Sequence, residues 1–343
     1  MYEVKEVRVN VPASTSNLGP GFDCVGLALD LTNRITVERV EGSGLEIEVH
    51  GEGVDRIPCD EANLTYRAMR RLFQEAGKEL KGVHLVLENH IPLRKGLGSS
   101  GAAILGGLTA AALLSGKEFS ERDILDLAFR MEGHPDNVVA ALLGGVVVAS
   151  RSNDHIETIR MDPPDGLRVI VAVPDFELST MEAREILPRQ IRFEDAVYNV
   201  GHAALLVAAL MAGDRRVLRE AMRDRLHQPY REPLIPGMRT VFEAALDAGA
   251  SGVAVSGAGP SLLALTWERF EEIAAAMKAA WSAFGVDAES LILEPCSSGL
   301  TMECPACRQT GLMEEHDALG SAELRDDRSG ARTLQDGGAD RRG

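Results

Sequence analysis

Aromatic residues and positive charge are both scarce in this chain of 343 residues. Phe, Tyr and Trp make up only 4% of the sequence, so Val, Leu, Ile and Ala must fill the core that a hydrophobic content of 45% allows. Lys and Arg number 36 against 52 Asp and Glu, which gives a formal net charge of −16. A nucleic-acid-binding protein shows a basic face, so we expect no nucleic-acid partner. A nucleotide ligand is still compatible with local Arg and Lys side chains.

Targeting segments and regularly spaced cysteines are missing as well. Residues 1–10 are charged and strand-like, unlike the apolar region of a signal peptide, and no apolar run reaches the length that spans a membrane. The five cysteines are scattered and odd in number, which is typical of reduced thiols. We therefore expect a cytoplasmic protein without membrane contact, built as one large or two medium domains.

The spacing of apolar residues predicts a mixed order of strands and helices, typical of an α+β fold with two domains. The first half has expected strands at 7–11, 35–41, 45–50, 83–87 and 144–149 and helices at 63–76, 102–114 and 121–131. The second half has expected strands at 167–173, 251–255, 262–267 and 290–294 and helices at 193–212, 215–222, 238–248 and 270–284. The polar segment 151–165, which ends in two prolines, is the predicted junction. The expected domains are residues 1–165 and 166–297.

The tail from 298 to 343 differs in composition from the rest. It has no Phe, Tyr, Trp, Ile or Val, so it has little apolar surface to offset its ordering entropy, and we expect disorder there. Cys304 and Cys307 have the spacing of half a zinc site. A closed site needs four ligands, and only His316 and Cys296 are further candidates, so incidental cysteines are the favoured interpretation.

The segment 92–103 reads PLRKGLGSSGAA and lies between an expected strand and an expected helix. Glycines let the backbone approach a ligand, free N–H groups at a helix start favour an anion, and serine hydroxyls add hydrogen bonds. Arg94 and Lys95 would help to hold a polyphosphate. The predicted nucleotide-phosphate site comprises Pro92, Leu93, Arg94, Lys95, Gly96, Leu97, Gly98, Ser99, Ser100, Gly101 and Ala102.

Other interpretations of this loop fit less well. Residues 96–101 match GxGxxG, but a dinucleotide site needs a second strand ending in an acidic residue roughly 20 residues later. Here that region begins a helix, with Ser120 as its N-cap. The Walker pattern is absent because no Gly-Lys-Ser/Thr follows. A simple Gly-Ser turn remains possible, although the two basic residues disfavour it.

The loop resembles the PxxxGLGSS signature of the GHMP small-molecule kinases. Two companion blocks occur in the family's order: VPASTSNLGPGFD at 11–23 and VSGAGPS at 255–261. The resemblance covers about residues 4–295. It implies the two-domain GHMP kinase fold, with a ribosomal protein S5 domain 2-like N-terminal domain and a ferredoxin-like C-terminal domain. It also implies ATP as phosphoryl donor and, as a family expectation, a homodimer.

The block EGHPDN at 132–137 indicates which branch of the GHMP kinases the chain resembles. It packs two carboxylates, an imidazole and an amide into six residues, which is unusual for a solvated helix end, and it resembles a segment of the homoserine kinases. The resemblance then implies phosphorylation of the L-homoserine hydroxyl on the route to threonine. It also implies Mg²⁺ contacts from Ser100 and Glu132; Mg²⁺ takes few protein ligands and prefers oxygen.

An amino-acid substrate needs groups for its ammonium and its carboxylate. Carboxylates and amide oxygens suit the first, and a guanidinium fork suits the second. The candidate substrate-binding residues are Asn17, Asp23, His134, Asp136, Arg184, Arg231 and Gly257. Arg184 and Arg231 stand in blocks that resemble those carrying the substrate arginines of homoserine kinases. A surface salt bridge is the alternative for a single arginine, and a turn between two strands is the alternative for Gly257.

The candidate catalytic residues are Thr180, Asn137 and Asp23. By resemblance, Thr180 lies near the γ-phosphate and the acceptor hydroxyl, whereas homoserine kinases lack a clear catalytic base and rely on positioning. We therefore expect Asn137 to position the reacting groups and Asp23 to bind substrate.

Two competing functions remain open. Another GHMP kinase would take a sugar or isoprenoid alcohol, against which the paired Arg184 and Arg231 argue. A ligand-binding pseudokinase would have lost some of Ser99, Ser100, Glu132 and Thr180, all of which are present.

Overall fold

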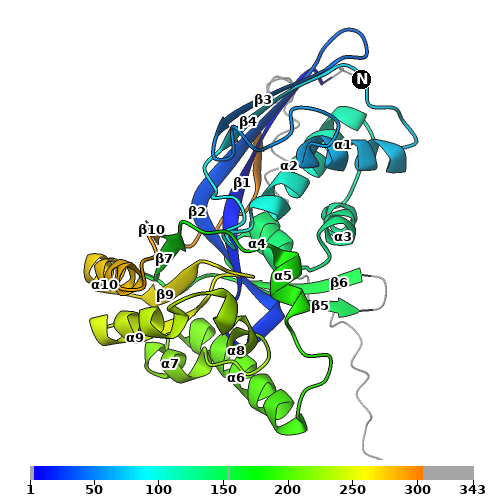
Figure 1. The fold of residues 1–343 in the computed structure, drawn as a ribbon. Helices are drawn as coiled ribbons and strands as arrows, with labels where there is room; N and C mark the ends of the chain where they lie inside the picture. Colours follow the sequence, from blue (N-terminus) through cyan, green and yellow to red (C-terminus); the bar gives the residue numbers. More distant parts are fainter. Residues whose placement is uncertain (1–3, 153–154, 304–343) are drawn as a thin grey trace, which may run out of the picture.

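A computed structural model describes residues 4–152 and 155–303 and contains two β-sheets with helices packed on both (Figure 1). The first sheet has the order β11-β1-β2-β4-β3, and β5 pairs with both β2 and β6. Its strands are β1 (Glu6–Asn17), β2 (Gly21–Arg39), β3 (Leu45–Gly51), β4 (Val83–Asn89), β5 (Val146–Ser152), β6 (His155–Met161) and β11 (Thr301–Glu303). Its helices are α1 (Leu64–Glu75), α2 (Ser99–Ser115), α3 (Glu121–Glu132) and α4 (Asp136–Leu143).

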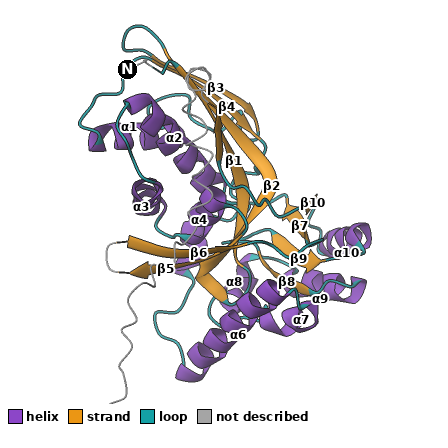
Figure 2. Cartoon of the chain, turned by 180° about the vertical axis from the view of Figure 1, so that it is seen from behind, coloured by secondary structure: helices purple, strands orange, loops and turns teal. Residues whose placement is uncertain are grey.

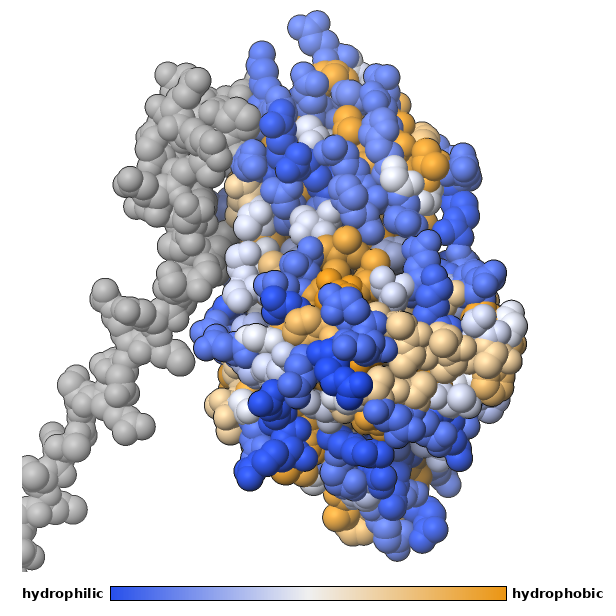
Figure 3. Space-filling view, turned by 90° about the vertical axis from the view of Figure 1, so that its left-hand side faces the viewer, coloured by the Kyte–Doolittle hydropathy of each residue, from blue (hydrophilic) through white to orange (hydrophobic). Residues whose placement is uncertain are grey.

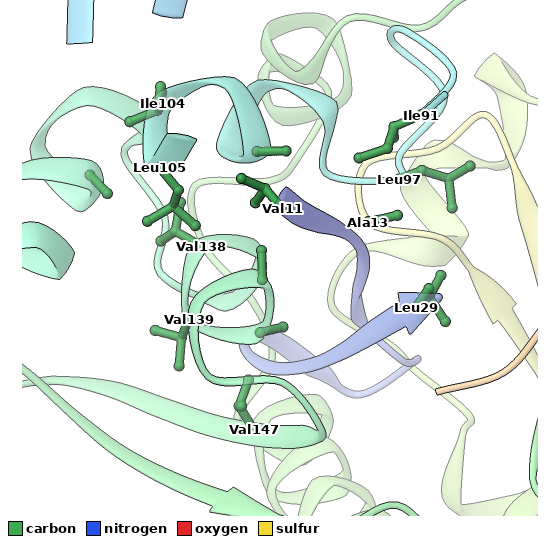
Figure 4. Packing of buried hydrophobic residues seen from close by; sticks show 14 of the residues in the cluster. Val11, Ala13, Leu29, Ile91, Leu97, Ile104, Leu105, Val138, Val139 and Val147 are labelled. Atoms are coloured by element: carbon green, nitrogen blue, oxygen red, sulfur yellow. The ribbon is translucent and has the colours of Figure 1, made fainter. Parts of the chain in front are cut away.

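The helices cover one face of the first sheet because its inward residues are almost all apolar. Val7, Val9 and Val11 alternate along β1 with 0% exposure, the period-two pattern of a half-buried strand. Figure 4 shows residues of α2 and α4, such as Leu105 and Val138, gathered around Val11. This packing fixes the N-terminal ends of α2 and α4, which line the candidate site.

The second sheet has the order β10-β7-β9-β8. Its strands are β7 (Arg168–Pro174), β8 (Gly252–Val255), β9 (Leu262–Thr266) and β10 (Ala288–Leu293). Its helices are α5 (Thr180–Glu185), α6 (Phe193–Ala212), α7 (Leu218–Ala221), α8 (Gln228–Arg231), α9 (Met238–Ala248) and α10 (Phe270–Ser282), with 3₁₀ turns η1 (Arg215–Val217) and η2 (Glu232–Leu234).

The central strand β7 is buried on both faces. Val169 and Val171 join the large core that continues into the first sheet, whereas Ile170 and Ala172 join a second cluster. The helices α9 and α10 contribute to this second cluster, and α6 and α7 to the first. Figures 1 and 2 show these four helices beside the second sheet. The side on which α9 and α10 lie is mostly hydrophilic, with hydrophobic residues in smaller patches (Figure 3). The mixed order of strands and helices confirms the predicted α+β class.

The expected polar junction at 151–165 is wrong in part, because it contains β6. This strand pairs with β5 over seven residue pairs and buries only Ile156, so its sequence carries little apolar periodicity. The expected boundary at 165/166 lies in the connection from β6 to β7.

The prediction of disorder from residue 298 is wrong for residues 298–303. Residues 301–303 form β11, which pairs antiparallel with β1 (Arg8 opposite Glu303). Backbone hydrogen bonds to a sheet edge need few apolar side chains, so composition did not reveal this strand. Cys304, Cys307 and His316 lie outside the described residues.

The helix α6 corrects one further expectation. By length and composition it could cross a membrane, although no such run was expected from the sequence. One side of α6 packs into the core through Leu206, Ala209 and Leu210, as a helix of a globular domain does.

Candidate active site

Three segments far apart in the sequence meet at the candidate site. Ser256 Oγ donates to the Gly96 carbonyl over 2.7 Å, the Gly257 N–H donates to the Ser16 carbonyl over 3.2 Å, and Asn17 Nδ2 donates to the Gly257 carbonyl over 2.7 Å. These bonds join the β1–β2 block, the glycine loop before α2 and the β8–β9 turn. Beside them lies a cavity of about 300 Å³, within the range of small-molecule sites.

Most of the predicted site residues line this cavity. They are Asn17, Asp23, Pro92, Arg94, Lys95, Gly96, Leu97, Gly98, Ser99, Ser100, Glu132, His134, Asp136, Asn137, Thr180, Arg184 and Arg231. Four predicted residues do not line it: Leu93, Gly101, Ala102 and Gly257. Five lining residues were not predicted: Ser16, Leu178, Ser179, Ala258 and Gly259. Each of the five lies next to, or between, residues of the recognised blocks, so proximity to a motif was the available signal.

The glycine loop ends in an uncapped helix start. The helix α2 begins at Ser99, three residues earlier than predicted, and its N-cap Gly98 has a φ of 73° and offers no side-chain cap. The first N–H groups of such a helix have no partner within the helix, so they are available to an anion. A Cβ at Gly96, whose φ is 75°, would lie 2.0 Å from the Ser256 carbonyl oxygen. Glycine is therefore needed where the two loops touch.

The two basic residues of the loop bind the connection between β7 and α5. Lys95 Nζ donates to the carbonyls of Pro174 (2.6 Å) and Phe176 (2.7 Å). Burial lowers the pKa of Lys95, although the charges of Glu177 and Asp175 oppose this. Arg94 lies 3.4 Å from Glu177. These contacts hold the glycine loop against the segment that leads to Thr180, and a direct role on phosphate stays a prediction.

A polar cluster lies where α3 ends and α4 begins. Ser100 Oγ donates to Glu132 Oε2 over 2.7 Å, and His134 lies 3.8 Å from Glu132 Oε1 and 3.1 Å from Asp136 Oδ1. Burial alone would lower the pKa of His134, but the hydrogen bond with Asp136 and the charges of Asp136 and Glu132 raise it. The adjacent hydroxyl and carboxylate oxygens of Ser100 and Glu132 are hard donors, so this pair fits a Mg²⁺ ion.

Asn137 is held on both sides by the β1 block. Its Oδ1 accepts from Ser14 Oγ over 3.0 Å, and its Nδ2 donates to Ser16 Oγ over 2.9 Å. Thr180 is the first residue of α5 and follows the N-cap Ser179, which forms a capping box with Glu182. Both candidates are thus held by structured elements at the cavity.

Two arginines line the same cavity. Arg184 pairs with Asp23 through its two terminal guanidinium nitrogens, Nη1 and Nη2, and Asn17 Oδ1 accepts from the Asp23 N–H. Arg231 is 1% exposed and donates to the carbonyls of Ala183 and Gly257. Burial and then the charge of Arg184 lower the pKa of Arg231 to about 10. Arg231 therefore remains protonated at neutral pH.

Comparison with known proteins identifies the family. The model described as GHMP kinases N terminal domain matches residues 63–145, and that described as GHMP kinases C terminal matches residues 206–283. A homoserine kinase of Microchaete diplosiphon is 45% identical over 290 residues, which are 84% of this chain and 94% of that protein. A homoserine kinase of Moorella thermoacetica is 43% identical over 291 residues, which are 85% and 98% of the two chains.

Solved structures agree with these relatives. The crystal structure of homoserine kinase from Cytophaga hutchinsonii has a TM-score of 0.80 at 32% identity and covers 88% of this chain and 99% of its own. A mevalonate kinase of L. major, 15% identical with a TM-score of 0.64, shares the fold. The predicted two-domain GHMP kinase fold is thereby confirmed. The chain belongs to the homoserine kinase family of the GHMP kinases.

Proposed function

We propose that this protein is a homoserine kinase, which transfers the γ-phosphoryl group of ATP to the side-chain hydroxyl of L-homoserine. The product is O-phospho-L-homoserine, on the route to threonine. The observation that carries the proposal is that one cavity combines two kinds of polar group. An uncapped helix N-terminus with two serines lines it, and so do Arg184, Arg231 and Asp23. Such a cavity suits a polyphosphate and a small zwitterion together.

ATP enters this proposal through the glycine loop. Its phosphates bind the N–H groups at the start of α2 and the hydroxyls of Ser99 and Ser100. Ser100 and Glu132 would hold Mg²⁺, which when bound neutralises negative charge on the phosphate oxygens. His134, whose Nδ1 lies 3.1 Å from Asp136 Oδ1, has its Nε2 3.8 Å from Glu132 Oε1, the carboxylate oxygen that Ser100 does not bind.

The acceptor end binds homoserine by its charges. Arg184 and Arg231 bind the carboxylate, while Asp23, Asn17 and Asp136 surround the ammonium. Because Asp23 and Arg184 pair with each other in this structure, each exchanges its partner for the opposite charge of the substrate. His134 completes the polar surroundings, and the Gly257 carbonyl, which accepts from Asn17 and Arg231, supports these two side chains from behind.

Positioning dominates the proposed mechanism, since phosphoryl transfer needs little covalent chemistry from the protein. Thr180 orients the acceptor hydroxyl toward the phosphoryl group. Asn137 is held by Ser14 and Ser16 and separates the ATP site from the homoserine site. Asp23 is assigned to the ammonium and not to proton abstraction, because its carboxylate already pairs with a cation, Arg184, in this structure.

An acceptor screen tests the function directly. Purified protein with ATP and MgCl₂ is assayed for ADP release with L-homoserine, mevalonate and galactose. We expect turnover with homoserine alone. Turnover of mevalonate or galactose without homoserine would establish another GHMP kinase activity, and binding of homoserine and ATP without turnover would establish a pseudokinase.

We also propose that the protein is cytoplasmic. A third proposal is that it forms a homodimer through the exposed side of α6. The exposed apolar residues Phe193 (80%), Val200 (71%) and Met211 (67%) lie along one side of this helix, and the same side carries Val197, Ala204, Leu205 and Ala208. Residues 196–211 include no Asp, Glu, Lys or Arg. A monomer rarely exposes such an apolar stripe.

A second copy of the chain suits this stripe better than another partner does. In an antiparallel pair of α6 helices, the uncharged stripe of each copy would cover the same stripe of the other. Light scattering should show a dimer for the wild type and a monomer for Val200→Asp, whereas Ile159→Asp, at an exposed apolar residue on β6, should stay dimeric. A monomeric wild type, or binding of α6 to lipid vesicles, would contradict this interface.

A further inference from the structure

His227 lies behind the acceptor site and contacts it through Arg231. The imidazole is fully buried, with Nδ1 3.1 Å from Arg231 Nη1 and Nε2 2.7 Å from the Gly19 carbonyl oxygen. A guanidinium can only donate hydrogen bonds, so Nδ1 must accept. The single proton of the neutral ring is then on Nε2, which donates to Gly19. Burial, against the opposing charge of Asp224, lowers the pKa of His227 to about 4, consistent with the neutral ring.

The surroundings of His227 leave its ring no freedom to turn. The Asp224 carboxylate is fully buried, and its Oδ2 accepts from the backbone N–H groups of His227 (2.9 Å) and Gln228 (2.6 Å). Phe22 stacks on the imidazole at a centroid distance of 5.0 Å. The charged groups that act on the ring are Asp224, Arg231 and Asp23. The imidazole therefore presents a fixed acceptor to Arg231.

The Nδ1 acceptor of His227 fixes the orientation of the Arg231 guanidinium. Nε donates to Ala183 and Nη1 to Gly257 and His227. Among residues 4–152 and 155–303, these hydrogen bonds involve Nε and Nη1 only, while Arg231 lines the cavity. The remaining nitrogen, Nη2, is thus the one available to a ligand. On its other side, His227 holds Gly19, two residues after the substrate-binding candidate Asn17.

We propose that His227 is a positioning residue, whose neutral imidazole orients Arg231 toward the acceptor carboxylate and couples this arginine to the β1–β2 loop that carries Asn17 and Asp23. The proposal rests on the proposed function for the identity of the acceptor. It distinguishes the two ring nitrogens: Nδ1 sets the substrate affinity, whereas the bond from Nε2 to Gly19 supports the loop.

Two substitutions separate these roles. In His227→Asn, the side-chain oxygen lies near the position of Nδ1 and can still accept from Arg231. In His227→Gln, the amide reaches the position of Nε2 and can still donate to Gly19, but Nδ1 is lost. We expect His227→Gln to raise the KM for homoserine roughly tenfold or more, the effect of losing one hydrogen bond to a charged group. The KM for ATP should stay within about threefold, and His227→Asn should retain most of the homoserine affinity.

A merely structural role for His227 predicts a different outcome. Both variants would then change the two KM values and kcat together, in proportion to their loss of melting temperature, and that result would overturn the proposal. NMR of ¹⁵N-histidine-labelled protein gives a readout that needs no substrate. We expect the Nε2–H tautomer for His227, with an Nδ1 signal that shifts in Arg231→Met. An Nδ1–H tautomer would overturn the proposal, whereas failure of the wild type to phosphorylate homoserine would overturn only the proposed function.

Discussion

Asp23 and Arg184 form a two-pronged ion pair at the acceptor end of the cavity, with Nη1 3.0 Å from Oδ2 and Nη2 2.6 Å from Oδ1. The residues are 161 positions apart and come from β2 and α5. About a third of each side chain is exposed, so the pair contributes at most about 1 kcal/mol to folding. Its opening for a zwitterionic substrate therefore costs little.

The first prediction concerns the charge at Arg184. Arg184→Met removes a charge-assisted, two-pronged contact to the substrate carboxylate and should raise the KM for homoserine by roughly 30- to 100-fold. Arg184→Lys keeps the charge without the fork, so an intermediate KM is expected. Steady-state kinetics with homoserine and ATP varied separately measure both effects. Arg192→Met, at an exposed arginine outside the cavity, serves as the control, and an equal rise of the KM for ATP in Arg184→Met would place Arg184 elsewhere in the reaction.

A second prediction follows from the contact between Ser100 and Glu132. Glu132→Gln can keep the hydrogen bond from Ser100 but removes the negative charge that would attract Mg²⁺. We expect a higher Mg²⁺ concentration for half-maximal activity and a kcat lower by about 10²-fold or more. A Mg²⁺ titration at saturating ATP measures the shift, with Glu118→Gln at an exposed position as the control. Unchanged Mg²⁺ dependence in Glu132→Gln would exclude this carboxylate as a metal ligand.

Local sequence patterns predicted the elements whose signals lie within one segment. The helices 193–212 and 238–248 have the predicted bounds, because glycines at 213 and 249 adopt the left-handed conformation that ends each helix. The strands β6 and β11 were missed because backbone pairing with a neighbouring strand, not apolar periodicity, defines them.

The motifs likewise predicted most of the cavity but not its supporting contacts. Which residues bind Lys95 could not be predicted, since its partners are backbone carbonyls of Pro174 and Phe176, and a carbonyl has no sequence signature. His227 was missed for a related reason. A lone histidine between Leu226 and Gln228 carries no pattern, and its importance appears only when Arg231 and Gly19 are found on its two nitrogens.

The third prediction tests why the glycine loop needs Gly96. Gly96→Ala combines a left-handed φ with a Cβ that would meet the Ser256 carbonyl at 2.0 Å, whereas Gly116→Ala at the other end of α2 has a φ of 65° and only the Lys78 Nζ at 3.9 Å. In both variants the alanine in a left-handed conformation costs about 1–2 kcal/mol. Only Gly96→Ala must also move the glycine loop away from the β8–β9 turn. We expect a raised KM for ATP and a clearly larger loss of melting temperature in Gly96→Ala. Equal losses in the two variants would mean that backbone strain alone selects glycine.

The last prediction concerns the dependence of stability on pH through His227. Its pKa of about 4 in the folded protein lies below the ordinary value of about 6.5 in an unfolded chain. As the pH falls below about 6.5, the unfolded chain binds a proton at His227, whereas the folded protein does not bind it until about pH 4. The free energy of unfolding therefore decreases across this window. The loss approaches about 3 kcal/mol, since each pKa unit corresponds to about 1.4 kcal/mol.

His227→Asn isolates this contribution because asparagine does not titrate. Urea unfolding at pH 7.5 and pH 4.5 should show that the wild type loses roughly 2–3 kcal/mol more than the variant between the two conditions, although both share every other titrating group. If the wild type and His227→Asn lost the same free energy of unfolding, His227 would have to gain its proton in the folded state at an ordinary pKa. The folded protein would then not favour the neutral ring, as the hydrogen bond from Arg231 to Nδ1 requires, because a protonated ring has no acceptor nitrogen. The pH experiment therefore tests, without any substrate, the same hydrogen bond that positions Arg231.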